Sequence, residues 1–367
     1  MSYKILTTKN EKEWESILQK TKNPDVYLTP GYAKIYEDSY NKLTNESFCG
    51  KAILFFSGNK ENFIILTTLK RKINDLNFLE KKREKIYYDL ISPYGYGGPI
   101  ICSTTKEKTE LLKDFEKDFT DYCQKNNIVT EFRRFHPIIQ NHKDFANHTQ
   151  IDKRNQTVYI DLTKNKEILF KEMNKKTRNL IRKAQKNKIQ IFLSKKEQDL
   201  KKFSELYEGT MQRANASQKY FFPYKFFKNT SIYLGNNISL FTAKYDNKII
   251  SASLFIHKGD SIHYHFSGSD KNYLNLAPNN LLLWYVALWA KKRGYKKFHL
   301  GGGLSNDPKD PLFHFKSGFS NTLSRFYTSN LIHDDKSYKT LNILKNEFQR
   351  EKEENPPNND FFPYYRG

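Results

Sequence analysis

The chain has 367 residues, a formal net charge of +22, and an apolar fraction of 38% that includes 28 Phe and 24 Tyr. This length suggests two domains or one large domain, and the charge favours a polyanionic partner: nucleic acid, a phosphorylated substrate or an anionic membrane surface. Cys49, Cys102 and Cys123 form no CxxC pair, which argues against structural zinc and for a reducing compartment. No apolar run approaches the length of a membrane span, and the first residues lack the apolar core of a signal peptide. We therefore expect a cytoplasmic protein whose only membrane contact would be peripheral.

The first half of the chain predicts strands that alternate with helices. We expect strands at residues 3–7, 50–56, 62–69 and 128–135, and helices at residues 10–20, after Pro30 and at 105–126. After the strand at 62–69, the segment 86–101 begins with a further strand that runs into the turn PYGYGGP at 93–99, in which prolines and glycines fix the backbone geometry. Its tyrosines would either line a groove with hydroxyl groups or form an aromatic-rich turn.

A second unit begins near Gln156 with the strand VYIDL, and Thr163 is expected to cap the helix that follows. An apolar stripe on this helix would face the core and contains Leu169, Met173, Thr177, Leu180, Ile181 and Ala184. The other faces carry many basic residues: Lys171, Lys175, Lys176, Arg178, Arg182, Lys183, Lys186 and Lys188. Exposed basic faces are often merely solvated, but only two glutamates offset the repulsion here, so a polyanion such as RNA is an equal interpretation.

The remaining elements follow the order of a GNAT acyltransferase domain. We expect a helix at 197–213, strands at 239–245, 248–257 and 261–269, a buried helix at 279–293, and strands at 295–301 and 323–331. Residues 3–135 give a looser version of the same order. The predicted fold class is α/β (α+β), with two GNAT-like domains at 1–155 and 156–331, each a mixed, mainly antiparallel sheet flanked by helices. Residues 332–367 are expected to form a helix and a tail that pack on the first domain.

The stretch LGGGLSNDPKDPLFHFKSGFS at 300–320 is the strongest candidate for a working site. The glycines at 301–303 end a buried strand, where glycine permits a sharp bend or the close approach of a ligand. Asp310 suits the N-cap of a short helix that Pro311 opens and Gly318 ends. Lys316 lies among aromatic residues on this helix. It would therefore offer a positive charge to a shielded cleft, or else interact favourably with the helix dipole near the C-terminus.

Six segments carry a more specific signal: PYGYGGPI, KKTRNLIRKAQK, LYEGTMQRANASQKY, IHYHFSGSD, FHLGGG and LFHFKSGFS. In this order they resemble the Fem-type peptidoglycan-bridge aminoacyltransferases, over roughly residues 25–330. The resemblance implies two GNAT-like domains. It also implies transfer of an amino acid from aminoacyl-tRNA to an amino group of a UDP-linked or lipid-linked cell-wall or surface-glycan precursor, and we expect no metal or other cofactor.

The same resemblance implies roles for individual residues. Lys316, which follows Phe315, would stabilise the transition state. Arg213 would bind a substrate phosphate, as would Lys34 in the first domain, and Tyr264 would line the site. Further substrate-binding candidates are Tyr220, Tyr96, Gly97 and Gly98. The RNA-binding candidates on the basic helix are Lys175, Lys176, Arg178, Arg182 and Lys183.

These residue types suit the expected chemistry. Aminolysis of an ester builds negative charge on the carbonyl oxygen, and one fixed cation in a low-dielectric cleft stabilises that charge. A second group could take a proton from the incoming ammonium. The sequence does not choose among the candidates for that role, which are His263, His265, His299, His314, Asp307 and Asp310.

Two acyl donors are consistent with such a domain. GNAT enzymes that use coenzyme A hold its pyrophosphate on a Q/R-x-x-G-x-G/A turn after the central strand. The corresponding stretch, SDKNYLNLAPNNLL, has no glycine pair, and Pro278 removes one backbone amide. This favours aminoacyl-tRNA. The alternatives are an N-acyltransferase that uses acyl-CoA or another acyl donor on a sugar in surface-polysaccharide synthesis, and a non-catalytic RNA-binding module supported only by charge. The amino acid, the acceptor and the oligomeric state stay open.

Overall fold

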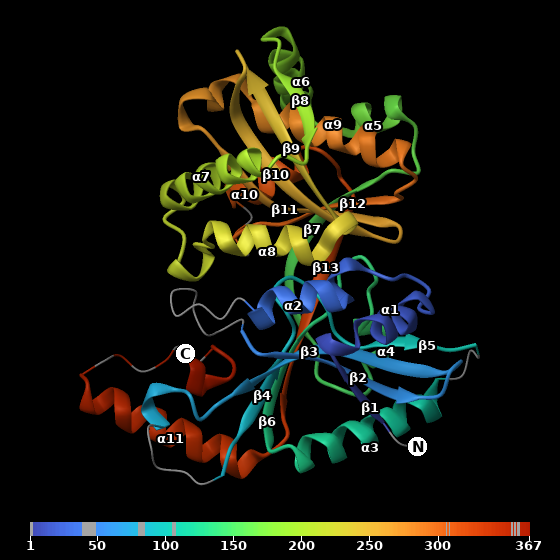
Figure 1. The fold of residues 1–367 in the computed structure, drawn as a ribbon, viewed down its shortest axis with the longest axis vertical. Helices are drawn as coiled ribbons and strands as arrows, with labels where there is room; N and C mark the ends of the chain where they lie inside the picture. The colour runs from blue at the N-terminus through green and yellow to red at the C-terminus, as the bar shows by residue number, and fades with distance from the viewer. Residues whose placement is uncertain are drawn as a thin grey trace. The chain divides into compact units, whose positions relative to one another are not determined.

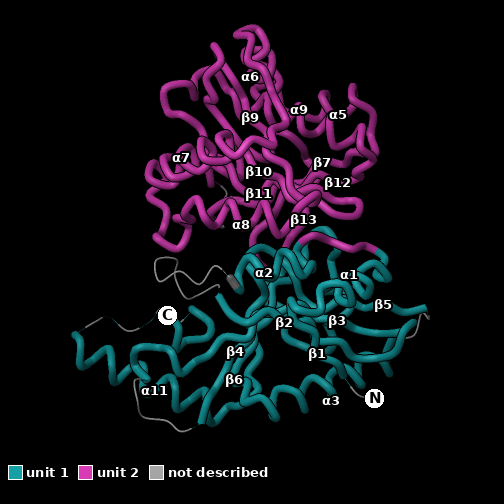
Figure 2. Tube along the Cα trace, viewed as in Figure 1, with its two compact units in different colours: residues 1–22, 27–153, 327–367 teal, residues 23–26, 154–326 magenta. Residues whose placement is uncertain are grey.

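The computed structural model describes residues 3–38, 49–79, 85–104, 108–305, 307, 309–353, 355, 357 and 360–367. The chain divides into two compact units (Figure 2). Unit 1 contains residues 1–22, 27–153 and 327–367, and unit 2 contains residues 23–26 and 154–326. Each unit has a mixed, mainly antiparallel sheet flanked by helices (Figure 1), which confirms the predicted fold class.

The sheet of unit 1 runs in the order β1, β2, β3, β4, β6, and then the last residues of β13. Its neighbouring strands are antiparallel except β4 and β6, and β5 pairs with β3. β2 and β3 are the predicted hairpin. The strand bounds are β1 (Lys4–Thr7), β2 (Lys51–Gly58), β3 (Phe63–Lys72), β4 (Tyr88–Ile91), β5 (Ile100–Cys102), β6 (Ile128–Arg134) and β13 (Leu323–Ile332).

Helices cover this sheet because they carry apolar stripes that it buries. On α3, Phe115 and Phe119 pack against Phe55 of β2, as the helical spacing of the apolar residues predicts. The expected start of this helix at Thr105 lies outside the described residues. The helix bounds in unit 1 are α1 (Glu11–Gln19), α2 (Pro30–Asp38), α3 (Thr109–Lys125), α4 (His142–Phe145) and α11 (Asp335–Glu351), with 3-10 turns at Thr8–Asn10, Asn77–Leu79 and Tyr364–Arg366.

The sheet of unit 2 runs in the order β7, β12, β11, β10, β9, β8. All neighbours are antiparallel except β11 and β12, which are parallel. The strand bounds are β7 (Asp152–Asp161), β8 (Gln190–Ser194), β9 (Ile238–Tyr245), β10 (Lys248–Lys258), β11 (Ser261–Ser269) and β12 (Lys297–Gly302). Strand β8, a short and partly exposed edge strand, was not predicted.

The two faces of the unit 2 sheet bury different helices (Figure 1). α9 and α6 pack on one face, where Phe241, Phe255 and Phe298 form the core. α7 and α8 pack on the other, around Phe266. The helix bounds are α5 (Lys166–Glu172), α6 (Lys175–Lys186), α7 (Glu197–Arg213), α8 (Tyr224–Leu234), α9 (Pro278–Lys292) and α10 (Pro311–Ser317), with 3-10 turns at Gln218–Tyr220, Gly235–Asn237 and Lys271–Leu276.

The prediction of one basic helix capped by Thr163 was wrong. Asn165 accepts a hydrogen bond from the amide of Ile168 (2.8 Å), so α5 begins at Lys166. Met173 is extended, and Asn174 then caps α6 by accepting from the amide of Thr177 (2.7 Å). Asparagine side chains compete with helical backbone hydrogen bonds, so two asparagines within ten residues divide the stretch into two helices.

Candidate active site

The parallel strands β11 and β12 pair only at their beginnings. Their register runs from Ser261–Lys297 to His263–His299 and ends there. Each strand also contains a bulge next to this last pair. In β11 the register with β10 skips His265, and in β12 the register with β7 skips Leu300. Bulges bend a strand and redirect its side chains, and they are common next to active sites.

The bulge in β11 decides where Tyr264 points. In a regular strand, Tyr264 and Phe266 would share a face. Because His265 is skipped, Phe266 packs on α7, while Tyr264 packs against Phe255 in the α9 core (ring centroids 5.7 Å apart). Burial raises the pKa of the Tyr264 hydroxyl, and hydrogen bonds with Ser267, Asn279 and Ser253 partly offset that rise.

Lys316 is a buried cation on α10. Its Nζ donates to the carbonyl of Gly302 (2.7 Å) and lies 6.0 Å from the centre of the Tyr264 ring. The residue is only 8% exposed, and burial lowers the pKa of its ammonium to about 8, with Asp310 acting in the opposite direction. The side chain thus turns to a neighbouring strand and does not bind the last carbonyls of its own helix. Gly301 gives it room, since a Cβ there would lie 3.2 Å from Nζ on a backbone with φ of +81°.

Asp310 holds the loop before α10 against that helix. One carboxylate oxygen accepts from the amide of Phe313 (2.8 Å), which confirms Asp310 as the predicted N-cap. The other oxygen accepts from the amides of Leu304 (2.7 Å) and Ser305 (2.9 Å). Burial raises the pKa of this carboxyl group, but these hydrogen bonds hold it below its usual range. Gly303 is required here because a Cβ would come within 2.6 Å of the carboxylate.

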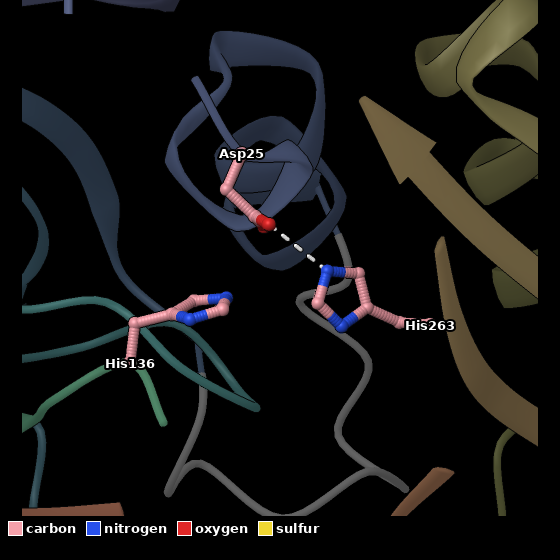
Figure 3. Close-up of side chains that lie close together, drawn as sticks. All are labelled: Asp25, His136 and His263. Carbon is pink, nitrogen blue, oxygen red and sulfur yellow. Dashed lines mark hydrogen bonds and ion pairs between the residues drawn. The ribbon is translucent and has the colours of Figure 1, made fainter. Parts of the chain in front are cut away.

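A buried chain of polar side chains lies at the last paired position of β11 and β12. Nε2 of His263 is 2.9 Å from Oδ2 of Asp25, which belongs to the segment 23–26 of unit 2 (Figure 3). Nδ1 of His263 is 3.3 Å from Nδ1 of His299. With neutral rings, both contacts are satisfied if His263 donates to Asp25 and accepts from His299. The sequence showed the two histidines but gave no sign that Asp25 would join them.

The other candidates for proton transfer differ in their surroundings. Asp307 and His314 are exposed, whereas Asp310 is occupied by the loop amides. Burial lowers the pKa of His265 to about 3, and the ring of His265 lies tilted against that of Phe266 (centroids 4.1 Å apart, interplanar angle 58°).

Arg213 lies at the far end of β11, and Tyr220 lies in the 3-10 turn Gln218–Tyr220 that follows α7. Arg213 is exposed at the end of α7 and donates to Thr210 (2.9 Å) and to the carbonyl of Ser269 (2.6 Å), the last residue of β11. The carbonyl of Tyr220 accepts from the hydroxyl of Tyr207 (2.7 Å). The first residue thus connects the end of α7 to the sheet, and the second connects α7 to the turn that follows it. Phosphate binding by Arg213 and substrate binding by Tyr220 stay predictions.

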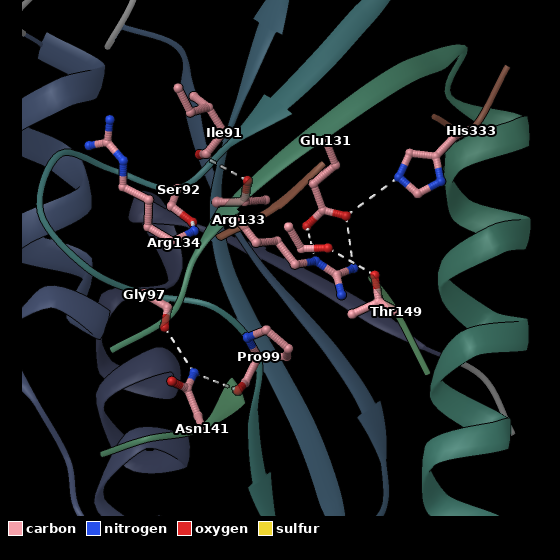
Figure 4. A network of polar contacts seen from close by, with 12 residues as sticks. Ile91, Ser92, Gly97, Pro99, Glu131, Arg133, Arg134, Asn141, Thr149 and His333 are labelled. Carbon is pink, nitrogen blue, oxygen red and sulfur yellow. Dashed lines mark hydrogen bonds and ion pairs between the residues drawn. The ribbon is translucent and has the colours of Figure 1, made fainter. Parts of the chain in front are cut away.

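The first-half candidates lie in unit 1. Lys34 is half-buried on α2. Gly97 and Gly98 are buried in a turn held by Asn141, whose amide donates to the carbonyls of Gly97 and Pro99 (both 2.9 Å; Figure 4). The Tyr96 ring packs on Tyr27 and His136 of the same unit. These contacts give the turn a packing role, and substrate binding by Tyr96, Gly97, Gly98 and Lys34 stays a prediction.

The basic candidates on α6 do not form one uniform surface. Lys175, Lys176 and Lys183 are exposed. Arg182 is exposed too, but its guanidinium lies 5.3 Å from the centre of the Phe170 ring. Arg178 is half-buried and donates to the carbonyls of Lys171 and Met173, the residues around the break between α5 and α6. We therefore infer a structural role for Arg178, while the three lysines retain the charge that an RNA backbone would need.

Residues 171–316 match the family model described as an acetyltransferase (GNAT) domain. The fold is similar to that of a solved structure titled FemX, with 14% identity, a TM-score of 0.69, and coverage of 93% of this chain and 99% of that one. The chain has the Fem-type, GNAT-like fold.

Two further solved structures are similar to this chain in fold. One is L-PGS from Bacillus licheniformis, with 12% identity, a TM-score of 0.53, and coverage of 93% of this chain and 96% of that one. Another is the C-terminal domain of a putative lysylphosphatidylglycerol synthetase from Agrobacterium fabrum, with 10% identity, a TM-score of 0.52, and coverage of 94% and 97%. No curated protein sequence matches the chain.

The match to the GNAT model lies within unit 2, ends at Lys316 and supports an acyltransferase. No helix in the described part of the chain has the length and apolarity needed to cross a membrane.

Asn279 belongs to the site around Lys316 and Tyr264 as well, since its amide donates to the Tyr264 hydroxyl (2.9 Å). Sequence reasoning missed it, although two adjacent asparagines at the start of an otherwise apolar helix were a visible signal.

Proposed function

We propose that the protein transfers an aminoacyl group from aminoacyl-tRNA to an amino group of a UDP-linked or lipid-linked cell-wall or surface-glycan precursor. The observation that carries the proposal is the buried Lys316 ammonium, held on the Gly302 carbonyl beside Tyr264. Burying a cation destabilises a protein, and a buried cation is therefore usually kept where it has a function. A fixed positive charge suits a reaction whose transition state carries an oxyanion.

In this reaction the acceptor amine attacks the ester carbonyl carbon, and negative charge develops on the carbonyl oxygen. An ammonium has three N–H bonds, and the Gly302 carbonyl takes one of them. A further N–H of Lys316 would donate to the oxyanion. When the intermediate collapses, the C–O bond to the tRNA ribose breaks, the amide forms, and the proton lost by the amine ends on the ribose hydroxyl. No covalent enzyme intermediate is needed, because the amine attacks the ester directly.

Two features favour aminoacyl-tRNA as the acyl donor: the backbone at the start of α9 and the exposed lysines of α6. A coenzyme A pyrophosphate would need consecutive free amides before a helix. Here Ala277 has a left-handed backbone conformation, and Pro278 occupies the first helical position without an N–H. The preceding turn Lys271–Leu276 contains no glycine. The exposed lysines of α6 supply charge for a tRNA backbone instead. The second candidate function, N-acyl transfer from acyl-CoA, is favoured by the match to an acetyltransferase model.

Product analysis separates the two candidates. The protein is incubated with a panel of UDP-linked amino sugars and UDP-linked cell-wall peptides, either with a charged tRNA mixture or with acetyl-CoA, and products are weighed by mass spectrometry. We expect an aminoacyl mass increase that needs charged tRNA and disappears after ribonuclease treatment. Lys316→Met serves as the inactive control. An acetyl mass increase with acetyl-CoA alone would instead establish the second function.

A further inference from the structure

The side chain of Asn279, at the start of α9, is half satisfied. Its Nδ2 donates to the Tyr264 hydroxyl (2.9 Å). Its Oδ1 is buried and accepts no hydrogen bond from any residue in the described part of the chain. Buried amide oxygens nearly always have a donor, because leaving one without a partner is destabilising.

Rotating the amide does not remove the problem. If Oδ1 and Nδ2 exchanged places, the oxygen would accept from the Tyr264 hydroxyl and the NH2 group would be left unmatched. Either orientation leaves one end of the amide in need of a partner. In one orientation the missing partner must donate a hydrogen bond, and in the other it must accept one. A variant whose side chain only accepts hydrogen bonds therefore distinguishes the two orientations.

The surroundings of Asn279 hold it in place. Ser253 and Ser267 act on the pKa of the Tyr264 hydroxyl that Asn279 contacts, and the Ser253 hydroxyl donates to the Ser267 hydroxyl (2.9 Å). The Tyr264 ring is packed on Phe255, and the Lys316 ammonium lies 6.0 Å from its centre. Asn279 and Lys316 therefore contact or approach the same tyrosine, one at its hydroxyl and one at its ring.

We infer that Oδ1 of Asn279 accepts a hydrogen bond from an N–H group of the acyl donor, and so selects donors that carry one. This inference rests on the proposed acyl transfer at Lys316. Two donors could supply the N–H group. In an aminoacyl ester it is the α-ammonium, one carbon away from the carbonyl whose oxygen Lys316 would stabilise. In acyl-CoA it is an amide of the pantetheine arm.

The test measures binding by calorimetry to three probes. The first is 3′-(L-alanylamino)-3′-deoxyadenosine, a stable mimic of the aminoacylated tRNA end. The second is its 3′-propionylamino counterpart, which lacks only the ammonium, and the third is coenzyme A. The variants are Asn279→Leu and Asn279→Asp. Asn275→Leu, an exposed asparagine in the preceding 3-10 turn, is the matched control, and melting temperatures verify folding.

We expect the wild type to prefer the alanyl probe over the propionyl probe by about tenfold or more, the usual effect of a hydrogen bond to a charged group. Asn279→Leu should bring the two affinities within about twofold, while Asn279→Asp and Asn275→Leu retain the preference. A wild type without that preference, whose coenzyme A affinity falls about tenfold in Asn279→Leu and persists in Asn279→Asp, also supports the inference and identifies the pantetheine amide as the source.

Two results would overturn the inference while leaving the proposed function standing. In the first, folded Asn279→Leu keeps both the alanyl preference and the coenzyme A affinity of the wild type. In the second, Asn279→Asp loses as much as Asn279→Leu, which would show that the NH2 group faces the ligand. If the wild type binds none of the three probes, the proposed function itself fails, and the inference fails with it.

Discussion

Lys316→Met should inactivate the enzyme and at the same time stabilise it. Methionine keeps the apolar stem and removes only the charge. The fall of the Lys316 pKa from 10.5 to about 8 corresponds to about 3 kcal/mol against the protonated lysine in the folded state at pH 7, because each pKa unit is worth about 1.4 kcal/mol. The variant loses the hydrogen bond to Gly302, which offsets about 1 kcal/mol. We therefore expect a net gain of roughly 1–2 kcal/mol at pH 7.

The pH dependence of this gain gives a sharper check. The folded-state pKa of Lys316 is lowered, so between about pH 8 and pH 10.5 the folded protein binds fewer protons than the unfolded chain, and the stability of the wild type rises with pH. The cost of burying the charge falls from about 3 kcal/mol at pH 7 to about 2 kcal/mol at pH 9. The stability advantage of Lys316→Met should therefore shrink by about 1 kcal/mol between these two pH values, as measured by urea denaturation.

Catalysis should change in the opposite direction. Losing one group that stabilises an oxyanion usually lowers turnover by about a hundredfold or more, so single-turnover rates of Lys316→Met should fall by that amount. The wild-type rate should fall as pH rises through about 8, where the ammonium loses its proton. Lys316→Arg should rescue poorly, since a planar guanidinium does not fit the space of an ammonium beside Gly301. Near-normal single-turnover chemistry in Lys316→Met, or a less stable variant at pH 7, would refute this reasoning.

Three further changes test other contacts and charges of unit 2. Asp310→Asn should lose about 2 kcal/mol of stability at pH 7, because a charged acceptor of three backbone amides becomes neutral. That contribution is present above the unfolded-state pKa of 3.8 and is lost as pH falls through the lower folded-state value, so a difference unchanged at pH 3 would contradict it. Gly268→Ala should cost about 3 kcal/mol or more, since its Cβ would lie 2.3 Å from the α7 backbone, and a melting temperature equal to that of the wild type would contradict this contact. Changing Lys175, Lys176 and Lys183 together to glutamine should lower the salt slope of tRNA binding by about 2 or more without lowering the melting temperature, whereas the same change at three exposed lysines of α3 should not alter the slope.

The sequence alone determined most elements of the fold and the stretch that holds the site. Helical spacing of apolar residues predicted α3, α7 and α9, and alternation with turn signals predicted β9, β10 and β11. Asp310, Pro311 and Gly318 predicted the start and end of α10, because caps depend on the chemistry of one or two residues. These features are local, and local physics is written in neighbouring residues.

Only the tertiary structure decided what surrounds the charge. Alternation along β11 would place Tyr264 beside Phe266, and a bulge at His265 separates them, because a bulge depends on the partner strand. The turn of Lys316 onto Gly302, the loop amides on Asp310 and the pairing of Asp25 with His263 each join residues 5 to 238 positions apart. Their pKa values follow from burial and from these partners, and no pattern of nearby residues encodes either one.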